Sequence, residues 1–144
     1  MSALLRNARI FLASGLLTGA LSAATDPAVD FQRQVRAILS ENCFHCHGPD
    51  KNTRMAGLRL DTREGAFSAR PGGSVIVPGD TRASLLYQRI SHDKDAMRMP
   101  PVFTKKTLTD QQKSVLKRWI EQGATWKEHW SFQAPVRPAS PRAW

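Results

Sequence analysis

Residues 42–50 read NCFHCHGPD and hold both cysteines of the chain, Cys43 and Cys46, followed directly by His47. A C-x-x-C-H pattern is typical of covalent haem attachment, because thiols with this spacing reach the two vinyl groups on one edge of a porphyrin. The adjacent imidazole then lies beneath the iron. The pattern therefore predicts thioether bonds from both cysteines and a proximal iron ligand from His47.

Other chemistries use similar cysteines. Zinc needs about four Cys, His or acidic ligands, and the further histidines, His45, His92 and His129, form no second paired cluster in the sequence. A thioredoxin-like redox site requires a βαβ context, whereas a helix is expected before this motif and a Gly-Pro loop after it. A structural disulfide would close a very small loop and leave the histidine unexplained. Zinc and disulfide remain the alternatives to haem.

A haem iron held on one side has a second axial position. Methionine sulfur favours the reduced iron and is the ligand of many electron-transfer cytochromes. Met99 is the first choice, because it precedes Pro100-Pro101 and proline restricts the backbone on both sides of the bond. Met97 is the competing methionine, and Met55 reads as a surface or gap-filling residue. A five-coordinate iron or a ligand from His92 is the remaining alternative.

The formal net charge of +9 favours an anionic partner. Arg98, Lys105 and Lys106 flank the predicted ligand loop and are equally consistent with haem propionate contacts and with solvated surface charges. Nucleic acid is disfavoured, because no aromatic-basic pattern is present and the chain reads as exported. A redox protein with an anionic surface is the expected partner.

Residues 1–24 contain two arginines and then a 12-residue apolar run from Ile10 to Leu21, ending in small residues. This order is typical of a secretory signal peptide cleaved after Ala24, and the run is shorter than the roughly 18 residues of a spanning helix. Cleavage would leave 120 residues with a charge of +7. A periplasmic or otherwise exported domain is expected, with an uncleaved signal anchor as the alternative.

Apolar spacing predicts an all-α domain of three main helices separated by long loops. The first runs from 27 to 40, with Asp26 as N-cap and Pro27 at the first position. A short helix is expected near 62–68, and another over 81–91 with its cap at residue 80. The last begins with a capping box, Thr109 with Gln112, and ends near residue 123. Because long loops bury little apolar surface, we expect a bound group to fill the centre.

Several separated stretches occur in one order: FQRQVRAILSENCFHCHGPD, GLRLDTREGA, IVPGD, SLLYQRI, MRMPP and RWIEQGATWKEHWSF. Together, over residues 31–132, they resemble the planctomycete-type cytochrome c domain, a relative of the small class I c-type cytochromes. The resemblance implies haem on Cys43, Cys46 and His47, with Met99 as distal ligand. It also implies an all-α cytochrome c fold in which the first and last helices cross, and we place Phe31 and Trp119 at that crossing.

The sequence thus divides into a signal peptide at 1–24, a haem domain at 25–132 and a proline-rich linker at 133–144, which would lead to a further domain. The favoured function is single-electron transfer by one covalently bound haem c, with no catalytic residues. A haem enzyme or a sensor of peroxide or gas, with a labile sixth ligand, is the second hypothesis. A zinc or disulfide interaction module is the third.

Overall fold

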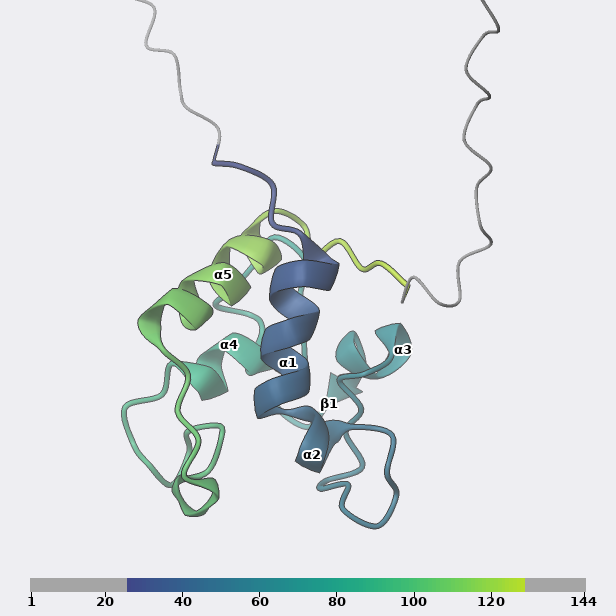
Figure 1. Ribbon diagram of the computed structural model, residues 1–144, viewed down its shortest axis with the longest axis vertical. Coiled ribbons are helices and arrows are strands. Elements are labelled where there is room, and N and C mark those ends of the chain that lie inside the picture. The colour runs from purple at the N-terminus through teal and green to yellow at the C-terminus, as the bar shows by residue number, and fades with distance from the viewer. Residues whose placement is uncertain (1–25, 129–144) are drawn as a thin grey trace, which may run out of the picture.

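The computed structural model describes residues 26–128, and their regular secondary structure is mostly helical (Figure 1). Helices α1 and α5 form the upper part in this view, and long loops form the lower part. The only sheet in the described part of the chain is a two-stranded antiparallel hairpin. The elements in order are η1 (Phe31–Val35), α1 (Arg36–Asn42), α2 (Phe44–His47), α3 (Arg63–Ala66), β1 (Ala69–Arg70), β2 (Gly73–Ser74), α4 (Leu85–Ile90), η2 (Val102–Thr104) and α5 (Asp110–Glu121).

The first helical segment begins later than the sequence pattern predicted. Asp30, and not Asp26, is its N-cap, and the Asp30 carboxylate accepts hydrogen bonds from the backbone N–H groups of Gln32 and Arg33. The first turn, η1, is a π-helix that continues directly into α1. The predicted cap was wrong because a second aspartate, four residues on, satisfies the first free N–H groups of the helix. The helix then runs into the cysteine motif, as expected.

Helix α5 has the end and the buried face that its sequence predicted. Thr109 and Gln112 form a capping box, in which each side chain accepts a hydrogen bond from the backbone of the other residue. The helix ends at Glu121, and Gly123 follows with a φ of 95°, a left-handed conformation that suits glycine. The predicted apolar face is buried throughout and comprises Val115, Leu116, Trp119 and Ile120.

The first and last helical segments cross where the sequence placed them. The ring centroids of Phe31 and Trp119 lie 5.6 Å apart, which confirms this contact. Trp126 adds a third ring, 4.4 Å from Phe31. Gln122 fixes the chain ahead of the first helix, since its side-chain oxygen accepts a hydrogen bond from the N–H of Val29. The segment ahead of the first helix is thereby joined to the C-terminal end of α5, at the upper end of the molecule in Figure 1.

One apolar core underlies this crossing and extends to the loops. Phe31, Trp119 and the inner faces of α1, α4 and α5 are buried in it. Loop residues complete the core, including Leu60 and Ile76, which are 1% and 2% exposed. The core therefore draws on both the helices and the loops between them. The core alone accounts for the upper part of the fold.

Helix α4 is shorter than predicted. It spans Leu85–Ile90, because Asp80 caps a turn before the helix and Ser84 is the N-cap itself. The buried Ser84 hydroxyl accepts a hydrogen bond from Val77 N–H and donates one to the Asp80 carbonyl. This closes the loop on itself, and the N–H of Gly79 bonds to the Ile120 carbonyl in α5.

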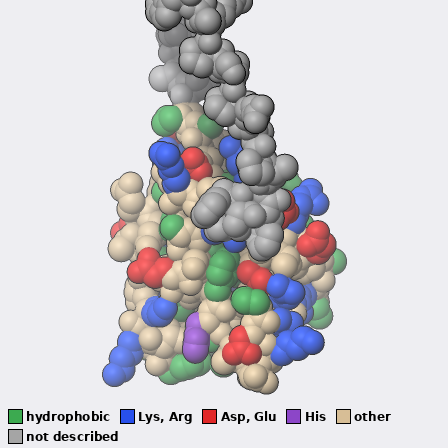
Figure 2. All heavy atoms as spheres, turned by 45° about the vertical axis from the view of Figure 1, so that its right-hand side comes forward, with side chains coloured by type: hydrophobic (Ala, Val, Ile, Leu, Met, Phe, Trp, Pro, Cys, Tyr) green, Lys and Arg blue, Asp and Glu red, His purple; other side chains and the backbone are tan. Residues whose placement is uncertain are grey.

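Basic side chains are dispersed over the face shown in Figure 2, among acidic and apolar ones, and form no continuous patch on it. Within residues 26–128, no helix is long and apolar enough to cross a membrane. The predicted signal peptide, the linker at 133–144 and His129 lie outside the described residues.

The capping box gives a stability prediction. Thr109→Ala removes the side-chain acceptor for the Gln112 N–H, so we expect the free energy of unfolding to fall by about 1 kcal/mol in urea titrations. Thr107→Ala is the matched control, because Thr107 is an exposed threonine two residues earlier and outside the helix. Equal effects of the two substitutions would contradict the role of the box.

Candidate functional site

The cysteine motif spans the junction of α1 and α2. Cys43 lies between these helices, and its carbonyl accepts hydrogen bonds from the N–H groups of Cys46 and His47, at 3.1 and 2.8 Å. The loop after the motif returns to it, because Met55 N–H donates to the Cys46 carbonyl and Leu60 N–H donates to the His47 carbonyl, both at 2.8 Å. The backbone of the motif is thereby held on both sides.

Gly48 allows the chain to turn sharply after the histidine. A Cβ atom at this position would lie 2.2 Å from the carbonyl oxygen of Phe44, which is too close for any other residue without movement of the backbone. The Arg54 guanidinium holds the same turn, donating to the carbonyls of Gly48 and Pro49 at 3.0 and 2.6 Å. Close packing against the Phe44 backbone therefore requires glycine at position 48.

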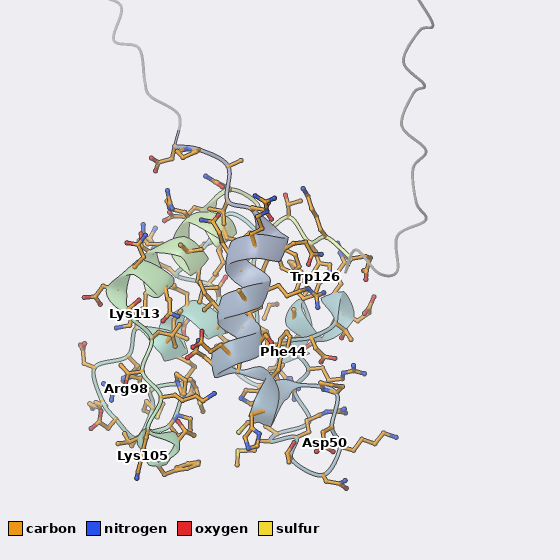
Figure 3. All side chains as sticks on the ribbon, in the orientation of Figure 1. Phe44, Asp50, Arg98, Lys105, Lys113 and Trp126 are labelled. Carbon is orange, nitrogen blue, oxygen red and sulfur yellow. The ribbon has the colours of Figure 1, made fainter. Side chains whose placement is uncertain are left out.

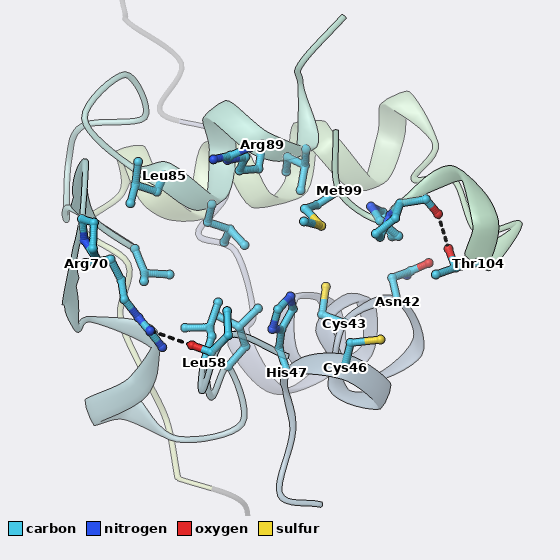
Figure 4. Close-up of a pocket in the computed structure, with 18 residues that line it drawn as sticks. Asn42, Cys43, Cys46, His47, Leu58, Arg70, Leu85, Arg89, Met99 and Thr104 are labelled. Atoms are coloured by element: carbon cyan, nitrogen blue, oxygen red, sulfur yellow. Dashed lines mark hydrogen bonds between the residues drawn. The ribbon is translucent and has the colours of Figure 1, made fainter. Parts of the chain in front are cut away.

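A mostly apolar cavity of about 350 Å³ opens beside the motif. This volume falls in the range of about 300–1,000 Å³ that is usual for cofactor and ligand pockets. Cys43, Cys46 and His47 form one wall, and the thiols and the imidazole lie on the same side in Figure 4. The remaining lining is Asn42, Ala56, Leu58, Leu60, Arg70, Pro71, Val75, Leu85, Leu86, Arg89, Ile90, Met99, Pro100, Pro101 and Thr104.

Met99 lies on the opposite wall, and its sulfur faces the motif across the cavity (Figure 4). Its N–H donates to the Arg89 carbonyl at 3.0 Å, which attaches this loop to the end of α4. Pro100, which follows it, is buried. The structure therefore brings together Cys43, Cys46, His47 and Met99, although about fifty residues separate the motif from the methionine.

Both cysteines are free, and Cys43 is unlike an activated redox cysteine. Cys43 packs against the apolar core, and burial raises the pKa of its thiol to about 12. Reactive cysteines instead have a lowered pKa, because the thiolate is the nucleophile and the metal ligand. The thiol at this position is therefore protonated at neutral pH. That is unfavourable for a thioredoxin-like site.

His47 is partly buried, and burial lowers its pKa, with a smaller effect in the same direction from the Arg70 charge. The Met55 backbone raises the pKa of His47 instead. The Nδ1 atom is nevertheless buried without a hydrogen bond of normal geometry in the described structure. Burial therefore favours the neutral ring, the form in which imidazole binds metals.

The alternative ligands lie away from the cavity. Met97 is 40% exposed, and its carbonyl and sulfur are 3.3 and 3.6 Å from Arg89 Nη1. His92 accepts a hydrogen bond from the Lys94 N–H through Nδ1. His45 and Met55 are exposed, and neither lines the cavity. Within residues 26–128, no group of three or more His, Cys, Asp or Glu side chains is arranged to hold a metal ion.

The basic residues chosen from the sequence also lie outside the lining. Arg98 pairs with Asp95 at 2.7 Å, Lys105 is exposed, and the Lys106 ammonium bonds to the Glu41 carbonyl. Figure 3 shows Arg98 and Lys105 in the lower-left loops. The cations that do line the cavity are Arg70 and Arg89, which sequence reasoning missed. The single available signal was the turn sequence Pro71-Gly72 directly after Arg70.

These features fit a covalently bound haem. The cavity offers two free thiols and a neutral imidazole with an unsatisfied buried nitrogen on one wall, and a thioether on the other. Between the walls the surface is mainly aliphatic, as a porphyrin face requires. Two thiols, an imidazole and a thioether are the donors that a c-type haem site would use.

Comparison with known proteins agrees with this interpretation. Residues 43–102 match the family model described as planctomycete cytochrome C. The match begins at the first cysteine and extends just beyond the Met-Pro-Pro motif, a narrower span than the resemblance over 31–132. No curated protein and no solved structure matches the chain significantly. Over residues 43–102 the chain is therefore similar to the planctomycete cytochrome C domain.

Proposed function

We propose that this domain binds one haem c covalently and transfers single electrons. The observation that carries the proposal is the placement of Cys43, Cys46 and His47 on one wall of an apolar cavity and of Met99 on the facing wall. When bound, haem supplies an iron that takes up and releases one electron. The cysteines would hold the porphyrin edge, and His47 and Met99 would be the axial ligands.

The protein contributes rigidity and exclusion of water. Hydrogen bonds from Met55 and Leu60 fix the backbone of the motif, and the bond from Met99 to the Arg89 carbonyl fixes the other wall. Ligands held in this way move little between oxidation states, which lowers the barrier to electron transfer. Leu58, Leu60 and the aliphatic residues of α4 exclude water, which together with a thioether ligand favours the reduced state.

The proposal includes export and an anionic redox partner. Export rests on the signal pattern of residues 1–24. The partner proposal rests on the net charge and on the loop that borders the Met99 wall, where Val102 and Phe103 are exposed at 53% and 72% beside Lys105. Exposed apolar side chains rimmed by basic ones are suited to a transient, charge-steered contact.

Covalent attachment is tested on a denaturing gel. The exported protein should retain haem after denaturation, and replacement of both Cys43 and Cys46 by alanine should abolish the haem stain. His45→Ala is the control, because His45 lies between the cysteines but is exposed and does not line the cavity. Stoichiometric zinc without haem in the purified protein would refute the proposal.

The distal ligand is tested by spectroscopy of the ferric protein. Met99→Ala should remove the sulfur-to-iron charge-transfer band at the red end of the spectrum and allow rapid carbon monoxide binding after reduction. Met97→Ala, on the same loop, should leave the band in place, because Met97 does not line the cavity. The opposite pattern would assign the ligand to Met97.

The charge-steering proposal can be tested with a simple anionic oxidant. Lys105→Glu should slow oxidation of the reduced protein by ferricyanide roughly three- to tenfold at low ionic strength, and the difference should disappear in high salt. Lys113→Glu makes the same change of net charge on α5, which contributes nothing to the cavity lining, and should have a smaller effect (Figure 3). Equal effects would show that only net charge matters.

A further inference from the structure

Arg70 is a cation that lines the cavity and has no anionic partner there. It is half-buried, whereas the other lining cation, Arg89, is exposed. The cavity residues of the described chain include no aspartate or glutamate, and the remaining titratable groups of the lining are His47 and the two cysteines. A guanidinium beside an apolar cavity is costly unless it is paired. No residue of the described lining provides a counter-charge at this place.

Most of the Arg70 donors form no hydrogen bond within residues 26–128. A guanidinium has five N–H donors, and here Nη1 donates to the Ala56 carbonyl at 2.8 Å (dashed in Figure 4). That bond orients the side chain across the end of the cavity. Arg70 forms no ion pair with any residue between 26 and 128, in contrast to Arg98 and Arg59, which pair with Asp95 and Asp61. The side chain is therefore both positioned and available.

The hairpin explains how Arg70 is held in this position. Arg70 is the last residue of β1 and is paired with Gly73 across the turn Pro71-Gly72. Gly72 and Gly73 have φ values of 95° and 139°, which other residues rarely adopt. Pro71 also lines the cavity, so the tip of the hairpin closes this end of it. The short sheet thus presents one cation to the cavity.

Arg70 and the cysteines lie at opposite ends of the cavity in Figure 4. In haem, the two propionates project from the edge opposite to the two vinyl groups. Cysteine attachment at one end would therefore direct the propionates to the other end. We propose, on the basis of the haem function proposed above, that Arg70 binds a haem propionate as a charge-assisted hydrogen-bond partner. This assignment replaces Arg98, Lys105 and Lys106, which the sequence had suggested.

This pairing has a consequence for the coupling of protons to electrons. A guanidinium beside the carboxylate keeps it ionised in both oxidation states. An electron then reaches the iron without a proton. Without the cation the carboxylate pKa rises, and more so in the ferrous protein, because the ferric iron favours the ionised form. One electron taken up by the iron then brings one proton to the carboxylate, and the midpoint potential falls as the pH rises.

The test is the midpoint potential of the holoprotein measured spectroelectrochemically from pH 5 to 8. We expect a nearly flat profile for the unmodified protein, a profile that declines with pH for Arg70→Gln, and recovery of the flat profile in Arg70→Lys. Arg98→Gln is the matched control and should stay flat, because Arg98 pairs with Asp95 and does not line the cavity. A flat profile for Arg70→Gln, or a declining one for Arg98→Gln alone, would overturn the assignment.

The denaturing gel distinguishes failure of the Arg70 inference from failure of the proposed haem function. Arg70→Gln should still retain covalent haem and the methionine charge-transfer band, since neither depends on the propionates. Haem present with an unchanged pH profile refutes the role of Arg70 and leaves the haem function intact. Absence of haem from the unmodified protein refutes both. If Arg70→Gln yields no stable protein, Arg70→Lys still decides the question. The carbon–oxygen infrared bands of the propionates in this variant should shift relative to those of the unmodified protein. Unchanged bands would count against the pairing.

Discussion

The packing of Phe31 on Trp119, with ring centroids 5.6 Å apart, joins helical segments that are nearly ninety residues apart in the sequence. The position of the cysteine motif depends on this contact, because α1 continues from the turn that bears Phe31 and leads straight into the motif. Once the crossing is formed, the direction and depth of α1 are set by the core. The motif is then delivered to one particular wall of the cavity.

The second wall is attached to the same core by another route. Ile90 and Leu86 on α4 are buried against the helices and also line the cavity. The carbonyl of Arg89 then holds the N–H of Met99, so the methionine loop is connected to the core through one short helix. Apolar packing therefore fixes both walls, and only a few hydrogen bonds are needed to place the groups between them. Long loops are tolerated because their ends are anchored.

Local patterns in the sequence predicted the parts of the structure that depend on local physics. The C-x-x-C-H spacing, the apolar face of α5 and the Thr109 capping box each lie within a dozen residues, so their geometry follows from helix periodicity. The first cap was wrong because Asp26 and Asp30 are equally good caps and only packing chooses between them. Arg70 was missed because it reaches the cavity through a hairpin with strands of two residues each. The Pro-Gly sequence predicts a turn there, but it does not predict which way the hairpin points. The signal peptide, the linker and the identities of the axial ligands remain predictions.

The two walls of the cavity differ in how much of the chain must fold to make them. The wall with Cys43, Cys46 and His47 belongs to one short helical stretch, whereas Met99 reaches its place only through α4 and the core. A partly unfolded chain could thus keep the first wall and lose the second. The sulfur side of the cavity would then report on the integrity of the tertiary structure. Ligation by Met99 would make the electronic state of the iron a direct measure of whether the helices are still packed together.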